Sequence, residues 1–79
     1  MQRKRPELLP RLIGQRVREL RKDVGVTQHT LAEKADVSVD FVSRVERGVC
    51  MPSMVRLMSI AKVLNVSLRD FFDSSLFSP

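Results

Sequence analysis

The sequence predicts an all-α domain built from five short helices. Apolar residues recur at intervals of three and four positions in five successive segments, and this spacing is typical of one face of a helix. Serine or threonine precedes four of these segments, and glycine or asparagine follows three of them, as is common at helix ends. No segment alternates apolar and polar residues, so no strand is expected.

The chain has 79 residues, which is enough for one small domain. We expect residues 1–9 to form a basic N-terminal arm, residues 10–73 to form the folded domain and residues 74–79 to form a C-terminal tail. A core of this size is marginally stable by itself, and association with a second copy is one way to support it.

The first helix is expected from Arg11 to Asp23, after Pro6 and Pro10. Gly25 is expected to end it, because glycine readily adopts the left-handed conformation that follows many helices. Thr27 then precedes the next apolar pattern and can cap a second helix. The apolar face of the first helix consists of Ile13, Val17, Leu20 and Val24.

Two short helices, Gln28–Ala35 and Val39–Arg47, are expected on either side of a tight turn. Asp36 suits this turn because aspartate is one of the few residues that tolerates a left-handed backbone. Val37 provides an apolar side chain that can pack beneath the turn, and Ser38 can cap the helix that follows by accepting a backbone N–H. The pattern predicts two helices that cross at a sharp angle.

Ser53 is expected to cap a fourth helix, which ends at Leu64 and is followed by Asn65 in the left-handed conformation. Ser67 is expected to cap a short fifth helix. That helix carries adjacent phenylalanines, which cannot both point in one direction, so one of them is expected to face the core. The apolar positions of these two helices are Met54, Leu57, Met58, Ile60, Ala61, Leu64, Leu68, Phe71 and Phe72.

From about Ile13 to Phe72 the chain resembles the lambda-repressor/Cro-like (XRE) helix-turn-helix family of DNA-binding proteins. The resemblance implies the five-helix lambda-repressor-like fold, in which one helix of the motif enters the major groove. A single helix-turn-helix match is a weak signal, but many matches in the same order are specific. The matching positions are Arg18 to Arg21, Gly25, Thr27-Gln28, Leu31-Ala32, Val37-Ser38, Ser43 to Gly48, Pro52-Ser53 and Val66 to Leu68.

Charge and composition agree with a nucleic-acid partner. The net charge is +5 and the isoelectric point is about 10.4, which favours a polyanion, although a solvated basic surface would have the same composition. The single cysteine allows no disulfide, and one cysteine with one histidine cannot complete a zinc site. No apolar run is long enough to span a membrane, so we expect a cytoplasmic protein that needs no cofactor.

An enzyme is not expected. The chain contains a single histidine, His29, and has no glycine-rich phosphate loop. No pair of carboxylates has the pattern of an active-site cleft. The sequence therefore favours a binding protein over a catalyst.

The N-terminal residues of the second helix of the motif are expected to contact base edges. Arg44 can donate two hydrogen bonds to guanine, Ser43 can approach closely, and Val39 can contact a thymine methyl group. Asp40 has two interpretations: it can accept a hydrogen bond from cytosine, or it can stabilise the first turn of its helix through the helix dipole.

Phosphate contacts are expected mainly from the first helix of the motif. The resemblance implies that Gln28 binds the DNA backbone, and His29 lies beside it. Arg16 and Arg47 are further predicted phosphate-binding residues. The basic arm can wrap the duplex, enter its minor groove or remain a solvated tail, and the sequence does not distinguish these possibilities; its cations are Arg3, Lys4 and Arg5.

The resemblance also implies a structural ion pair. In the family, an arginine late in the first helix pairs with a glutamate late in the helix that contacts the bases, and Arg21 and Glu46 match these positions. A bidentate arginine–carboxylate pair would fix the angle between the two helices.

The resemblance implies a homodimer that binds a (pseudo)palindromic operator, with half-sites about one helical turn apart. The expected dimer interface lies near the C-terminus, although the same side chains could instead complete a small core. It comprises Val66, Leu68, Arg69, Phe72, Leu76 and Phe77. The leading interpretation is a dimeric transcription regulator, and the compact length resembles restriction–modification controller proteins. The alternative is an antitoxin-type or adaptor protein whose main task is to bind a protein partner through this C-terminal surface.

Overall fold

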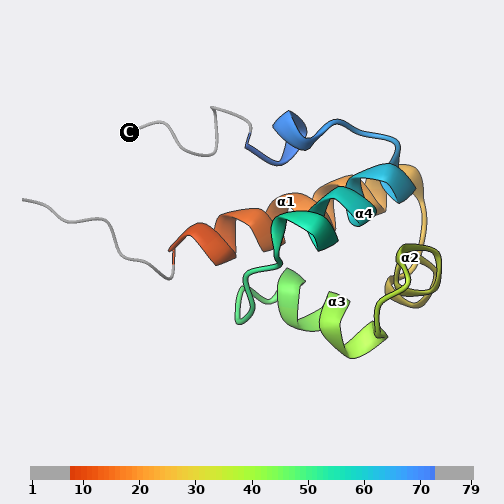
Figure 1. Cartoon of the computed structure of the whole chain (residues 1–79), viewed down its shortest axis with the longest axis horizontal. Coiled ribbons are helices and arrows are strands. Elements are labelled where there is room, and N and C mark those ends of the chain that lie inside the picture. Colours follow the sequence, from red (N-terminus) through yellow and green to blue (C-terminus); the bar gives the residue numbers. More distant parts are fainter. Residues whose placement is uncertain (1–7, 73–79) are drawn as a thin grey trace, which may run out of the picture.

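The computed structural model describes residues 8–72. Within this range all regular secondary structure is helical, which confirms the predicted all-α class. The fifth helix, however, is a short 3-10 helix, so the structure has four α-helices rather than five. None of the described helices is long and apolar enough to cross a membrane. The elements, shown in Figure 1, are α1 (Leu8–Val24), α2 (Gln28–Ala35), α3 (Val39–Glu46), α4 (Met54–Leu64) and the 3-10 helix η1 (Leu68–Phe72).

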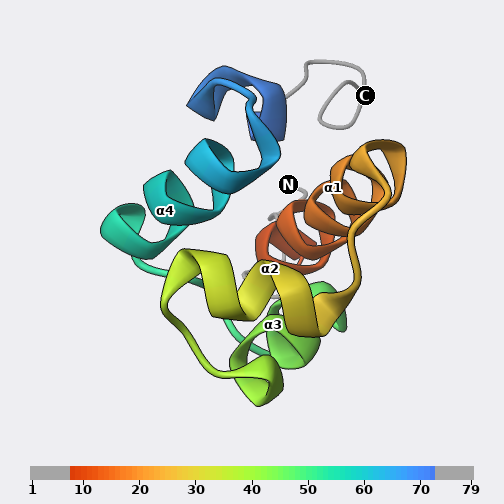
Figure 2. The same ribbon diagram turned by 90° about the vertical axis from the view of Figure 1, so that its right-hand side faces the viewer.

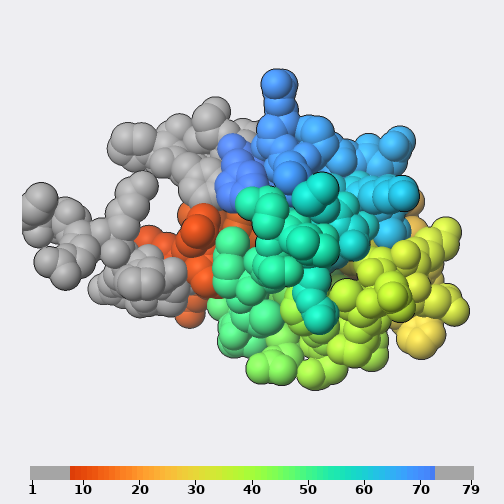
Figure 3. Space-filling model, in the orientation of Figure 1, coloured from red at the N-terminus to blue at the C-terminus, as the bar shows by residue number. Residues whose placement is uncertain are grey.

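The helices pack so that α3 and η1 lie at opposite edges of the molecule. Helix α3 packs against α1 and α2, whereas α2 also packs against α4, and η1 rests on α1 and α4. Figure 2 shows α2 and α3 next to each other, with α3 farthest from η1. In the space-filling view of Figure 3, residues of α3 reach the lower surface and residues of η1 the upper one.

Helix α1 begins three residues earlier than predicted. Pro10 lies in its first turn, not before it. This position is compatible with proline, because the first N–H groups of a helix have no intrahelical acceptor to lose. At the other end of α1, Val24 is 49% exposed, so it does not extend the buried face as its spacing suggested.

Serine and threonine caps begin α2, α3 and α4, as predicted. The hydroxyl of Ser38 accepts a hydrogen bond from the backbone N–H of Phe41 at 3.0 Å, and Thr27 and Ser53 make the equivalent bonds for α2 and α4. At the other ends, Asp36 and Asn65 adopt the left-handed conformation, with φ of 59° and 58°. These local contacts fix where α2, α3 and α4 begin and where α2 and α4 end.

The core contains one apolar stripe from each helix. Gly14 of α1 is buried where α1 crosses the last turn of α3, and a Cβ atom at this position would collide with the carbonyl oxygen of Val45. The close approach of these two helices therefore requires glycine. The largest fully buried side chains are Ile13, Val17, Leu31, Val42, Val45, Leu57, Ile60, Leu64 and Phe71.

Two residues predicted on the apolar face of α4 lie outside the core. Met54 and Met58 are 56% and 54% exposed. The buried stripe of α4 runs along Leu57, Ile60, Ala61 and Leu64, and the described neighbours of α4 cover only that stripe. The two methionines lie with Val55, which is 73% exposed, on the uncovered side of the helix.

The adjacent phenylalanines of η1 separate as expected. Phe71 is completely buried, whereas Phe72 is 39% exposed. Asp70 accepts hydrogen bonds from both the backbone N–H and the hydroxyl of Ser67, at 2.9 Å and 3.2 Å. This side-chain contact fixes the first turn of η1 and so directs Phe71 into the core.

Candidate nucleic-acid interface

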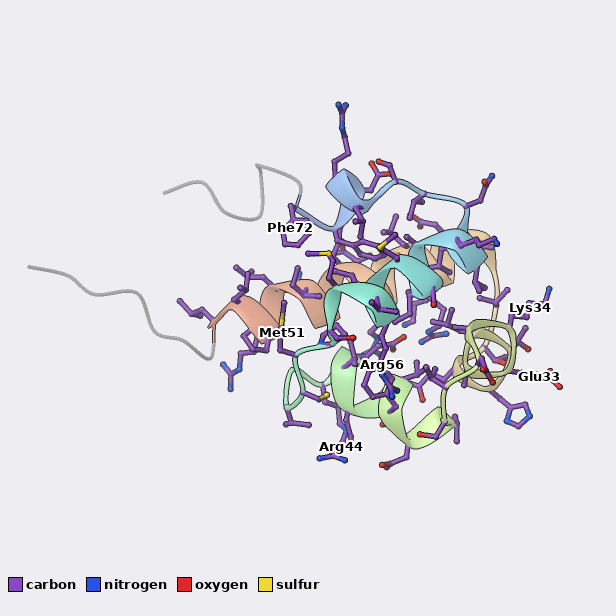
Figure 4. The ribbon with its side chains drawn as sticks, viewed as in Figure 1. Glu33, Lys34, Arg44, Met51, Arg56 and Phe72 are labelled. Atoms are coloured by element: carbon purple, nitrogen blue, oxygen red, sulfur yellow. The ribbon has the colours of Figure 1, made fainter. Side chains whose placement is uncertain are left out.

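The outer face of α3 is polar, charged and accessible. The side chains of Asp40 and Arg44 are 73% and 55% exposed, and Val39 is 44% exposed. In Figure 4, Arg44 points away from α1 and α4. Val39, Asp40 and Arg44 therefore share one outward face at an edge of the molecule, whereas Ser43, the fourth residue predicted to contact bases, is half-buried.

Each arginine on this face contacts a residue one turn earlier in α3. Arg44 lies 3.8 Å from the carboxylate of Asp40, and Nε of Arg47 donates a hydrogen bond to the hydroxyl of Ser43 at 3.3 Å. Because these side chains are exposed, such pairs contribute little to stability. The aspartate also occupies the first turn of α3, where a negative charge is favoured by the helix dipole.

A largely buried ion pair holds α3 against α1. The guanidinium of Arg21 donates to both carboxylate oxygens of Glu46, at 2.6 Å and 3.1 Å, and its third nitrogen donates to the carbonyl oxygen of Val26 at 2.9 Å. The two side chains are only 12% and 3% exposed. This is the arginine–glutamate pair that the family resemblance implies, and it constrains the orientation of the outer face of α3.

Gln28 joins the same network from the start of α2. Its Nε2 donates to the carboxylate of Glu46 at 3.0 Å. A side-chain amide has two N–H groups, so one can remain on Glu46 while the second donates to an anion. The contact thus links the orientation of α3 to a residue predicted to bind phosphate.

On the opposite side of α3, Phe41 contacts α4. The guanidinium carbon of Arg56 lies 4.9 Å from the centre of the Phe41 ring, a distance typical of a cation–π contact. Arg56 was not predicted as a site residue, because the contact joins two helices and depends on how they pack. No pattern in the sequence indicated it.

Arg16 does not lie with the other predicted phosphate-binding residues. Its Nε donates to the carbonyl oxygen of Asp70 at 2.6 Å, and its Nη1 lies 3.5 Å from Glu19. These contacts place the guanidinium against η1, which is far from α3. We therefore leave Arg16 out of the interface proposed below.

The remaining predicted phosphate-binding residues divide into two groups. His29 is exposed on α2 beside Gln28, and Arg47 is exposed just after α3. Both side chains are therefore accessible to an anion. Arg3, Lys4 and Arg5 lie outside the described residues.

The predicted dimer residues are partly engaged with the core. Val66 and Leu68 are half-buried and pack against it, whereas Arg69 is exposed. Leu76 and Phe77 lie outside the described residues. Among the described residues, α4 has three exposed large apolar side chains (Met54, Val55 and Met58), whereas the predicted segment up to Phe72 has one (Phe72). The sequence did not indicate this, because the spacing suggested that Met54 and Met58 belong to a buried face.

No cluster of potential metal ligands occurs between Leu8 and Phe72. The interface consists instead of a charged helix face bordered by amide and guanidinium donors. Such a surface can bind an extended polyanion through hydrogen bonds and charge.

Comparison with known proteins identifies this arrangement. A helix-turn-helix family model matches residues 17–71. The chain belongs to the helix-turn-helix family. This match confirms the resemblance to the lambda-repressor/Cro-like group, and its bounds include all of α2, α3 and α4.

The relatives of the chain include named transcription regulators. It is 38% identical over 63 residues to the HTH-type transcriptional regulator SinR of Bacillus subtilis, in a match that covers 78% of this chain and 57% of the relative. It is 36% identical over 56 residues to an immunity repressor of Bacillus phage phi105, with 71% and 39% covered. The chain spans about half the length of several curated relatives that it matches.

Solved structures share the fold. The restriction–modification controller protein C.AhdI from Aeromonas hydrophila superposes with a TM-score of 0.78 at 36% identity, covering 80% of this chain and 96% of that one. The clp gene regulator ClgR from Corynebacterium glutamicum gives a TM-score of 0.82 at 33% identity, with 87% and 77% covered.

Proposed function

We propose that this protein binds double-stranded DNA in a sequence-specific manner and regulates transcription. The observation that carries the proposal is the exposed outer face of α3, on which Val39, Asp40 and Arg44 lie together while a buried ion pair fixes the helix from behind. A helix of this kind fits the major groove and can place its N-terminal side chains on base edges. The named regulators among the relatives support the same function.

In this proposal Arg44 contacts a base and Gln28 contacts a phosphate. Arg44 can move from Asp40 to guanine, because a 3.8 Å pair between exposed groups is weak. Gln28 keeps one N–H on Glu46 and donates the other to the DNA backbone. His29 and Arg47 provide further contacts with the same strand region.

Selection of bound duplexes from a random pool tests the proposal. The wild-type protein should enrich one motif, and Arg44→Ala should lose the preference at one or two positions of each half-site. A single good bidentate contact discriminates against the wrong base by about 1–3 kcal/mol. An unchanged motif in the variant would remove Arg44 from the set of base-contacting residues, and no enrichment by the wild type would refute the function.

We further propose that the protein acts as a homodimer on a (pseudo)palindromic operator. Support comes from the exposed apolar side chains of α4 and η1: Met54, Val55, Met58 and Phe72 are between 39% and 73% exposed. Contiguous exposed apolar surface is typical of protein–protein contact sites. Sedimentation velocity of the pure protein, with and without a duplex carrying two half-sites, measures the assembly directly.

The same apolar surface also fits the alternative, in which a different protein is the main partner. The two functions differ in their response to DNA and salt. A DNA-binding regulator binds its duplex with an affinity that falls steeply as salt rises, because counterions are released from the neutralised phosphates. A protein that remains monomeric and shows no salt-dependent DNA binding would favour the alternative.

A further inference from the structure

We propose that Arg56 of α4 binds a DNA phosphate on the side of α3 opposite to Gln28. This inference rests on the proposed DNA-binding function and adds a residue to its interface. Arg56 lies outside the two helices of the motif, since it occupies the first turn of α4. Figure 4 shows its side chain between α4 and α3.

The guanidinium of Arg56 has a defined position, but its N–H groups are not used in hydrogen bonds with other described residues. It lies over the Phe41 ring at 4.9 Å, and it makes no hydrogen bond or ion pair with any other described residue. A cation–π contact uses the charge of the guanidinium and does not itself provide a hydrogen-bond acceptor for its N–H groups. Those donors remain available for an anion, and Arg56 is exposed to receive one.

The position of Phe41 places Arg56 on a defined side of α3. The buried stripe of this helix consists of Val42 and Val45. At about 100° per residue, Phe41 lies on one border of that stripe and Glu46 on the other. Glu46 accepts the hydrogen bond of Gln28 from α2, so the amide and the guanidinium border α3 on opposite sides.

The positions of Gln28 and Arg56 on either side of α3 correspond to the two phosphate backbones that border a major groove. The groove is about 12 Å wide, and a helix with its side chains is about 10–12 Å across. A helix inserted there has a phosphate backbone on each side. Gln28 is placed to meet one strand, and Arg56 is placed to meet the other.

The connection between α3 and α4 carries one charge, at its start. It spans residues 47–53 and begins with Arg47, and the rest of it, from Gly48 to Ser53, contains no charged group. Arg56 is the first cation after this loop. A phosphate near the α3–α4 connection would therefore meet its guanidinium before any other charge of α4.

The experiment compares Arg56→Ala with Lys62→Ala across a salt series. Both variants remove one positive charge from α4, but Lys62 lies near the other end of the helix. Fluorescence anisotropy gives Kd for the selected duplex between about 0.05 and 0.3 M salt. Loss of one phosphate contact lowers the slope of log Kd against log salt by about 0.9, which corresponds to roughly eightfold weaker binding at ~0.1 M salt.

We expect this loss for Arg56→Ala but not for Lys62→Ala, and we expect Arg56→Lys to keep most of the slope because it keeps the charge. The preferred base motif should not change in any of the three variants, because a phosphate contact carries no sequence information. Thermal unfolding of each variant establishes that the fold is retained. Should Arg56→Ala lower the melting temperature, Arg56→Gln, which removes the charge but keeps much of the side chain, takes its place in the comparison with Lys62→Ala.

The outcomes separate the two proposals. If the wild type does not bind duplex DNA, the DNA-binding function fails. If the wild type binds and Arg56→Ala keeps the slope measured for Lys62→Ala, the role of Arg56 is overturned while the function stands. A changed base motif in Arg56→Ala would also overturn it, since the contact would then be with a base.

Discussion

Helices α3 and α4 each bury one apolar stripe in the same core, yet their outer faces differ in chemistry. The outer face of α3 carries Asp40 and Arg44, whereas that of α4 carries Val55 and Met58. Burial of the inner stripes stabilises the fold, and neither outer face is needed for that. In the functions proposed above, the charged face of α3 contacts DNA, and the exposed apolar side chains of α4 contact another protein surface.

The two helices also differ in how they are held. Helix α3 is oriented by the buried pair of Arg21 and Glu46 and by a glycine contact with α1. Helix α4 has apolar packing and a serine cap. A helix whose angle must match a DNA groove gains from directional hydrogen bonds, because apolar packing tolerates small rotations more readily.

The largest effect is expected for Glu46→Ala. The substitution leaves Arg21 largely buried without its carboxylate and removes the acceptor of Gln28. Loss of one partner of a buried ion pair costs about 3–5 kcal/mol, so chemical denaturation should show a large drop in stability. Asp40→Ala, which removes an exposed carboxylate from the same helix, is the matched control and should change stability little. Equal stability of the two variants would contradict the structural role of the pair.

A smaller loss is expected for Gly14→Ala. The added methyl group meets the carbonyl oxygen of Val45, so α1 and α3 must separate. Overpacking of this kind costs about 1–3 kcal/mol. Gln15→Ala alters the next residue, which is exposed, and should leave the melting temperature nearly unchanged. A stable Gly14→Ala protein would show that the two helices do not need their close approach.

The serine caps allow a direct test of the two helices. Ser38 and Ser53 accept equivalent bonds at 3.0 Å and 3.2 Å, and replacement of either by alanine should cost about 1 kcal/mol of stability. DNA affinity should fall more in Ser38→Ala, because this cap fixes the end of α3 that is proposed to contact the bases. Equal losses of affinity in the two variants would argue against that assignment.

The smallest effect on stability is expected on the outer face of α4. The double variant Val55→Ser/Met58→Gln replaces exposed apolar groups, so its unfolding free energy should stay within about 0.5 kcal/mol of the wild type. Its self-association, measured by sedimentation velocity, should weaken. Unchanged self-association would exclude this face of α4 from the dimer interface.

Local features of the fold were predictable from the sequence. The caps at Ser38 and Ser53 and the left-handed residues Asp36 and Asn65 occur where the sequence predicted them. Each depends on contacts within one turn of a helix, so a short stretch of sequence contains all the participants. The separation of Phe71 from Phe72 was predictable for the same reason, since adjacent residues of a helix point in different directions.

Features that join distant segments were not predictable in this way. The sequence did not indicate that Arg16 would bond to the backbone of Asp70, 54 positions later, or that Arg56 would lie over Phe41. Met58 has the spacing of a core residue but is exposed. The spacing of apolar residues shows which of them share a face of a helix, but it does not show whether another helix covers that face. The Arg21–Glu46 pair also joins distant segments, but it was expected, because the family resemblance implies which residues of the fold lie close together.

By itself the sequence determined the four α-helices, the capped ends of α2, α3 and α4 and the family of this protein, because periodicity, capping and turn residues act over a few positions. The tertiary structure decided which cations surround α3 and which apolar groups remain outside the core. Those outcomes depend on how rigid helices pack in three dimensions. The close approach of α1 and α3 at Gly14 and the contact of Arg56 of α4 with Phe41 of α3 are two results of that packing.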